Sequence, residues 1–160
     1  MSNYRQLTEE EINILEDNSC WAEDWTAVLV DEDFKPNFFH RVLFYGEIRL
    51  GATEKNVEIT NGFFKHSGIN NSTLRNVTVG DNCLIENISN YINNYKIGDD
   101  CYISNVCTLE TTEGATYGKG NLISVLNEVG EGNLMLFDNL NSQFAAFMVK
   151  HSGDKEMKSQ

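Results

Sequence analysis

The chain has little proline, little positive charge and no long apolar run. Pro36 is the one proline among 160 residues, and 12 Lys and Arg stand against 24 Asp and Glu, which gives a formal net charge of −12. This charge repels phosphate backbones, so we expect neither nucleic acid nor an anionic membrane surface as a partner. No apolar run is long enough to span a bilayer and the N-terminal segment is acidic, so we expect a cytoplasmic protein without a membrane span.

Metal-binding motifs are also missing from the sequence. Its four cysteines form no CxxC pair and no cluster with histidine at zinc spacing. A zinc site of three converging histidines is not expected either, because of the three histidines only His66 lies inside the repeat described below. We therefore predict no metal site.

The N-terminal residues carry the signals of a short helix. Thr8 is a good N-cap, Glu11 three residues later completes a capping box, and Leu7 and Ile12 stand at the positions of a hydrophobic staple. Asn18 follows the last apolar position. We expect a helix of roughly nine residues that begins after Thr8.

Two tryptophans follow the expected helix, four residues apart and beside acidic residues. Trp21 and Trp25 flank Glu23 and Asp24, an arrangement that could form a sugar platform with carboxylate partners. The alternative, which we favour, is that both indoles pack over the open end of the next domain, where their large area stabilises it. Residues 1–50 are then a helix and an aromatic cap.

An internal repeat of six residues, a hexad, fills most of the remaining chain. Apolar residues recur at every sixth position, at Val79, Ile85, Tyr91, Ile97, Ile103, Leu109 and Ala115. The same spacing holds upstream at Val57, Phe63 and Ile69 and, after a slip of two, downstream at Tyr117, Ile123, Val129 and Met135. A helical period of 3.6 residues cannot produce this pattern.

The hexads also repeat in groups of three. Residues 79–85 and 97–103 match each other, and their first positions are three hexads apart. A unit of six that recurs in groups of three predicts three short strands per turn of a triangular coil. We expect an all-β fold in which residues 51–149 form a parallel β-helix of about five coils, followed by a polar tail over residues 150–160.

The strand geometry assigns roles to the other residues of each hexad. Side chains alternate between faces, so the residue two places before each aliphatic also points inward, and Cys83 and Cys101 then stack on neighbouring coils. A disulfide between them is one alternative, and buried reduced thiols are the state we expect in the cytosol. Glycine after the aliphatic is expected at corners. Twenty asparagines suggest amide ladders along the axis, at Asn121, Asn127, Asn133 and Asn139.

These hexads resemble those of the hexapeptide-repeat superfamily, whose fold is the left-handed parallel β-helix. Many of its members are trimeric acyltransferases or parts of sugar nucleotidyltransferases. More closely, four segments resemble the N-terminal part of an uncharacterised bacterial β-helix family, a domain of unknown function sometimes labelled a sugar-nucleotide transferase. The segments are residues 20–25, 37–51, 62–69 and 141–149. Since members of that family are longer, the resemblance implies a catalytically incomplete N-terminal fragment that acts as a scaffold or binding module.

Two alternative functions remain open. In a trimeric acyltransferase acting on a sugar or nucleotide-sugar, His66 or His40 would be the general base and an acyl-CoA the donor. In a carbohydrate-binding module, Trp21 and Trp25 with the acidic residues beside them would hold the sugar without chemistry. Apart from such an acyl-CoA we expect no cofactor.

The C-terminal residues contain an apolar run, from Phe144 to Val149. A β-helix ends in an unpaired edge, and such edges are normally covered. We expect the run to drive self-association, or to pack on a further β-helix part that follows in longer relatives.

Overall fold

The structure, a computed structural model, describes residues 4–112, 114–115, 118, 120–124, 133–137 and 140–150. The chain divides into two compact units, Met1–Thr112 and Glu113–Gln160. The fold is mostly β with a mixed sheet, as the sequence predicts at the level of fold class.

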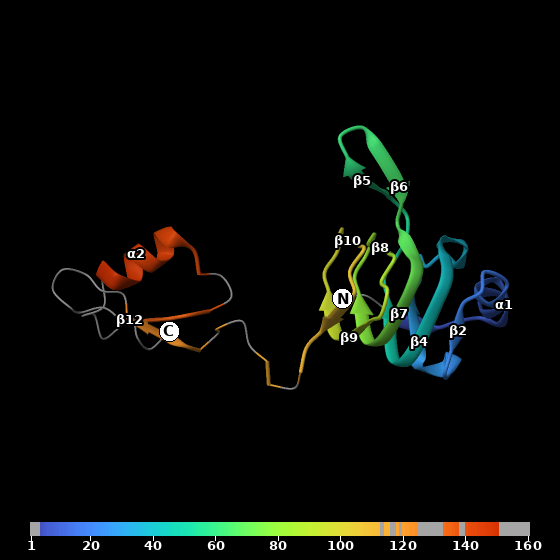
Figure 1. The fold of residues 1–160 in the computed structure, drawn as a ribbon, viewed down its shortest axis with the longest axis horizontal. Helices are drawn as coiled ribbons and strands as arrows, with labels where there is room; N and C mark the ends of the chain where they lie inside the picture. Colours follow the sequence, from blue (N-terminus) through green and yellow to red (C-terminus); the bar gives the residue numbers. More distant parts are fainter. Residues whose placement is uncertain are drawn as a thin grey trace. The chain divides into compact units, whose positions relative to one another are not determined.

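The first unit is built on a nine-stranded sheet within residues 4–112 (Figure 1). Strands β1 and β3 pair antiparallel, and the other pairs of this sheet are parallel. Its strands are β1 (Tyr4–Gln6), β2 (Trp21–Ala22), β3 (Val28–Asp31), β4 (Phe39–Leu50), β7 (Gly68–Val79), β8 (Leu84–Glu86), β9 (Tyr91–Ile97), β10 (Tyr102–Ser104) and β11 (Thr108–Glu110). Helix α1 (Glu9–Asp17) and the 3₁₀ turns η1 (Trp25–Ala27) and η2 (Pro36–Phe38) lie between the first strands.

Three of the parallel strand pairs, β8 with β10, β7 with β9 and β9 with β11, are separated by nearly the same length of chain. Leu84 of β8 pairs with Tyr102 of β10, and Leu74 of β7 pairs with Ile92 of β9, in each case three hexads further along the chain. Tyr91 of β9 pairs with Thr108 of β11, one residue short of the same interval. The interval of three hexads predicted from the sequence therefore describes the register of these strands.

The aliphatic hexad positions form the core of the first unit. Ile85, Val79 and Ile97 are buried, together with Ile69 and Leu74 on β7. Ile103 and Leu109 are partly buried and pack against the same cluster. Tyr91 is the exception among the predicted positions, because it is only partly buried and its neighbour Ile92 lies in the core instead. At Val79, Ile85 and Ile97 burial at every sixth residue is as the pattern predicts.

Asparagine has a different role from the one predicted. Its backbone lies in the left-handed region, with φ between 47° and 58°, at Asn71, Asn76, Asn82, Asn87, Asn94 and Asn105. Asparagine tolerates this conformation better than most residues, so it suits the places where the chain turns. Amide ladders do occur, but at these turns: Asn76 Nδ2 donates to Asn94 Oδ1 at 3.2 Å.

Of the glycines that follow an aliphatic hexad residue, Gly80 is required by close approach of the next strand level and Gly98 is not. A Cβ built on Gly80 would lie 2.7 Å from the carbonyl carbon of Gly98, whereas one built on Gly98 meets nothing within 4 Å. Real Cβ atoms do not approach backbone so closely. Glycine is thus required at position 80 because the backbone of the next level packs against it, and not because of a positive φ angle.

The predicted N-terminal helix is confirmed as α1. Thr8 Oγ1 accepts from the Glu11 backbone N–H, and the Glu11 carboxylate accepts from the Thr8 backbone N–H, which completes the capping box. Arg5 donates to both Glu11 carboxylate oxygens at 2.8 Å, and this pairing lowers the pKa of Glu11. The helix ends at Asp17 and buries Leu15 in the core.

The hexad prediction is wrong for Val57 and Phe63. They lie on β5 (Asn56–Thr60) and β6 (Phe63–His66), an antiparallel hairpin that projects from the stacked strands (Figure 1). Phe63 is 51% exposed. Across this insertion Phe39 of β4 pairs with Ile69 of β7, which is five hexads further along the chain instead of three. Because the insertion adds two whole hexads, it preserves the apolar spacing without forming part of the stack.

The second unit also departs from the predicted parallel winding. Strands β12 (Leu122–Ser124) and β13 (Asn133–Met135) pair antiparallel, with Ile123 opposite Leu134. The predicted hexad residues Tyr117 and Val129 lie outside the described residues, as do Asn127 and Asn139 of the predicted ladder and the tail from residue 151 onward. The apolar run that starts at Phe144 forms helix α2 (Ser142–Lys150).

The four cysteines are free, and Cys20 and Cys83 are buried. Burial raises the pKa of the Cys83 thiol to about 12. Its Sγ donates to the Gly98 carbonyl oxygen at 3.0 Å. In the described part of the chain, neither α1 nor α2 has the length and hydropathy needed to cross a bilayer.

Candidate functional site

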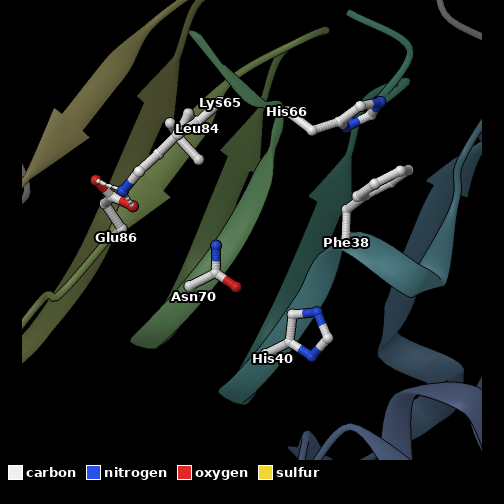
Figure 2. A pocket seen from close by; sticks show the side chains of 7 residues that line it. All are labelled: Phe38, His40, Lys65, His66, Asn70, Leu84 and Glu86. Atoms are coloured by element: carbon white, nitrogen blue, oxygen red, sulfur yellow. Dashed lines mark hydrogen bonds and ion pairs between the residues drawn. The ribbon is translucent and has the colours of Figure 1, made fainter. Parts of the chain in front are cut away.

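Both histidines proposed as general bases line one cleft of about 300 Å³ in the first unit. Its other lining residues are Phe38, Lys65, Asn70, Leu84 and Glu86. Figure 2 shows Lys65 meeting Glu86 on one side, Phe38 and the histidines on the other, and Asn70 between them.

The register of three parallel strands produces the floor of the cleft. His40 of β4 pairs with Asn70 of β7, and Asn70 pairs with Glu86 of β8. Paired residues on neighbouring parallel strands project to the same face, about 4.8 Å apart. An imidazole, an amide and a carboxylate are therefore arranged in one row.

A glycine allows close packing at the start of β7, beside this row. Gly68 pairs with Leu84 and lies next to Phe38, where an added Cβ would come within 2.8 Å of the Phe38 Cβ atom. Its φ of +154° also disfavours a side chain. Gly68 thus lets η2, which carries Phe38, and the start of β7 approach closely.

The β5–β6 hairpin supplies the remaining wall and is anchored at its base. Asn82 Oδ1 accepts from the backbone N–H groups of Glu54 and Lys55, and the Ser67 N–H donates to the Lys55 carbonyl oxygen. Asp81 Oδ1 accepts from the Ala52 N–H at 3.0 Å. These bonds fix the two ends of the hairpin, so that Lys65 and His66 reach the cleft from a defined position.

Glu86 is the most enclosed ionisable group of the cleft, at 8% exposure. Lys65 Nζ lies 2.8 Å from Oε2 and 3.0 Å from Oε1, and the Tyr102 hydroxyl donates to Oε1 at 3.1 Å. The hydrogen bond to Glu86 raises the pKa of Lys65. The pair is charge-neutral, so the cleft carries little net charge despite the acidity of the chain.

His66 is held by its ring face and by one nitrogen. The ring stacks on Phe38 with centroids 3.5 Å apart and planes 10° apart, and Nδ1 lies 2.9 Å from the Ser67 carbonyl oxygen. A carbonyl can only accept, so Nδ1 carries the proton and Nε2 of the neutral ring is an acceptor. His40 is exposed, and no hydrogen bond to its ring occurs among the described residues.

The aromatic candidates are not brought together as one platform. The Trp21 ring, 48% exposed, lies against Tyr45 at 5.5 Å, whereas Trp25 lies against Phe44 at 6.1 Å and its Nε1 donates to Glu16. Asp24 accepts from the backbone N–H and hydroxyl of Thr26, a hydrogen-bonded turn that lowers the pKa of Asp24.

Glu23 is exposed, and its backbone N–H donates to the carbonyl oxygen of Phe44. Trp25 packs against the core, in line with the packing interpretation, whereas Trp21 is exposed and lies outside the core.

The polar cleft residues that were not predicted from the sequence are Lys65, Asn70 and Glu86. The hexad register could have predicted that Asn70 lies beside Glu86. It could not extend the row to His40, because the hairpin insertion changes the interval between β4 and β7. No group of three or more ligating side chains suitable for a metal ion is found in the described part of the chain.

The chain belongs to the family described as a domain of unknown function (DUF4954), which matches residues 4–160. It is also similar to an uncharacterized protein of Treponema pallidum (strain Nichols), with 30% identity over 145 residues, covering 84% of this chain and 20% of the relative. The chain thus spans about a fifth of that relative's length. No solved structure matches it.

Proposed function

We propose that the first unit is a left-handed β-helix of the hexapeptide-repeat type. We further propose that it is the binding module of a cytoplasmic, sugar-nucleotide transferase-like protein and holds a sugar or nucleotide-sugar in the His66 cleft. The fold part of the proposal is supported by parallel pairs separated by about three hexads and by asparagine turns in the left-handed region.

The observation that carries the binding proposal is the chemistry of the cleft wall. Asn70 offers an amide donor and acceptor, His66 Nε2 an acceptor, and the exposed His40 a further polar edge. Charge is balanced by the Lys65–Glu86 pair. Polar groups that both donate and accept, in a cleft without net charge, suit a polyhydroxylated ligand.

Binding can be separated from packing by changing one ring. His66→Phe keeps a ring that can stack on Phe38 but removes both nitrogens, including the one bonded to the Ser67 carbonyl oxygen. We therefore expect a loss of stability of about 1 kcal/mol and at least tenfold weaker binding. The measurement is isothermal titration calorimetry with N-acetylglucosamine and UDP-N-acetylglucosamine. Arg49→Ala, on β4 outside the cleft, is the control. Equal affinity of His66→Phe and the parent chain for these ligands excludes the cleft as their site.

Acyl transfer is the second candidate, favoured by the Ser67 carbonyl beside His66 Nδ1. In that reaction Nε2 takes the proton of a sugar hydroxyl or amine while its oxygen or nitrogen attacks the thioester carbonyl of an acyl-CoA. The carbon–sulfur bond breaks, and the thiolate leaves and receives the proton. Acetyl-CoA turnover that persists in both His66→Ala and His40→Ala rules this candidate out.

We also propose self-association through helix α2. Phe144 and Phe147 are 45% and 43% exposed, and their rings lie 6.3 Å apart. Gel filtration of the parent chain and of Phe144→Ser tests this, because only the parent should elute as an oligomer. A monomeric parent chain contradicts the proposal.

A further inference from the structure

A second cleft of about 320 Å³ lies along the same parallel strands and shares no residue with the His66 cleft. It is lined by Tyr45, Thr73, Arg75, Tyr91, Asn93 and Glu110. Four of these form one row, because Tyr45 pairs with Arg75, Arg75 with Asn93 and Asn93 with Glu110. Their side chains are therefore spaced by about 4.8 Å along one face of the stack.

The buried amide of this row has one unused hydrogen-bonding group. Asn93 is 5% exposed, and its Nδ2 donates to Glu110 Oε1 at 2.7 Å. The Tyr91 hydroxyl donates to the other oxygen of Glu110 at 3.3 Å, which holds the carboxylate in place. Asn93 Oδ1 has no partner among the described residues. Buried polar atoms are rarely left without a hydrogen-bond partner, so this oxygen is free to accept a hydrogen bond from a ligand.

The neighbouring position carries an uncompensated positive charge. Arg75 is exposed, and no described residue forms a hydrogen bond or ion pair with its guanidinium. The carboxylate of the same cleft, Glu110, already accepts from Tyr91 and Asn93, so the guanidinium of Arg75 can pair with an added anion. On its other side is Tyr45, whose ring is braced by Trp21 at 5.5 Å.

We propose that this cleft binds a small hydroxylated anion, either a carboxylate or a phosphate ester. The anionic group pairs with Arg75, and a hydroxyl close to it donates to Asn93 Oδ1. Arg75 and Asn93 stand on neighbouring strands, so one small ligand that carries both an anionic group and a hydroxyl can reach both side chains. The apolar face of the ring lies against Tyr45. This site is independent of the function proposed for the His66 cleft.

The test titrates the full chain with D-glucuronate, glucose 1-phosphate and neutral glucose, followed by nuclear magnetic resonance of the cleft amides. We expect both anions, or one of them, to shift the signals of Arg75 and Asn93, and glucose to bind at least tenfold more weakly. Which anion binds better identifies the carboxylate or the phosphate as the natural group. If neither anion shifts these signals at 10 mM, the proposal is wrong.

Two variants locate the contacts. Arg75→Gln should weaken anion binding at least tenfold, while Arg49→Gln, which changes an arginine on β4 whose side chain is 43% exposed, alters it less than twofold. Asn93→Leu removes the buried acceptor and should abolish the effect of the hydroxyl, so that glucuronate binds no better than acetate. Unchanged affinity in Arg75→Gln, or equal losses in both arginine variants, overturns the assignment.

Discussion

Residues 79–110 and residues 118–137 share a hexad spacing but not a strand arrangement. In the first segment, strands about three hexads apart pair in parallel around a buried core. In the second, β12 and β13 pair antiparallel, and Leu122 is 61% exposed. Apolar spacing alone therefore does not specify the parallel stack.

The difference lies in the turns. In the first segment turns are made by Asn82, Asn87, Asn94, Asp100 and Asn105, all with positive φ, and several bond to the level above or below. The described turns of the second segment use Gly118 and Gly120. Glycine permits the same φ but has no side chain to bond to a neighbouring level. Hydrogen bonds from turn side chains to neighbouring levels are thus found in the segment whose strands pair in parallel.

The largest effect is expected from removing a core aliphatic. Ile85→Ala should lower the free energy of unfolding by about 2–5 kcal/mol, because the side chain is fully buried. Leu122→Ala, in the second segment, should change it by less than about 0.5 kcal/mol. Urea unfolding measures both, and equal losses would show that the two segments share one core.

A glycine pair probes the contact between successive levels. Gly80→Ala places a Cβ against the Gly98 backbone and should cost about 1–3 kcal/mol. Gly98→Ala meets nothing and should be neutral or up to about 1 kcal/mol stabilising, through the unfolded chain. The flanking sequences are nearly the same, so thermal unfolding of the two variants isolates the stacking. Equal melting temperatures contradict it.

Two substitutions at Asn76 separate the contribution of its backbone conformation from that of its side-chain hydrogen bonds. Asn76→Ala should cost about 1–2 kcal/mol, since alanine is strained at φ 52°. Asn76→Gly relieves the strain and loses only the bonds to Glu47 and Asn94, so it should be the milder change. Asn90→Ala, which loses a bond to Thr108 without relieving any strain, is the control. If Asn76→Gly is as damaging as Asn76→Ala, backbone strain is not the reason for asparagine there.

The smallest effect on stability is expected from the ionisation of the buried Cys83 thiol. Burial raises the pKa of Cys83 to about 12 from an ordinary value of 9.0, so folding favours the protonated form. The resulting stabilisation is fully present below pH 9 and is lost as the pH rises toward 12. The stability difference between the parent chain and Cys83→Ala should therefore shrink between pH 8 and pH 10.5 in urea titrations. A constant difference would show that folding does not raise the pKa of this thiol.

Helix α1 and the register of β8 with β10 and of β7 with β9 could be predicted, because their signals are local or periodic. The capping box is set by Thr8 and Glu11 alone. The hairpin could not be predicted, because an insertion of two hexads leaves Val57 and Phe63 in phase with Ile69.

The candidate site was predictable only in part, for the same reason. His40 and His66 are candidate bases from the sequence alone. Their placement in one cleft depends on the length of the hairpin and on its anchoring by Asn82, which no pattern in the chain encodes.

The anchored hairpin also indicates how this architecture can acquire new specificity. The chain leaves the stack after Leu50 and returns at Gly68, and the bonds from Asp81 and Asn82 hold its departure and the Ser67–Lys55 bond its return. Loop length between these fixed points can change without shifting any strand register. Other segments can therefore be grafted between Leu50 and Gly68. Such a graft would change the side chains that line the cleft and would keep the strands beneath it.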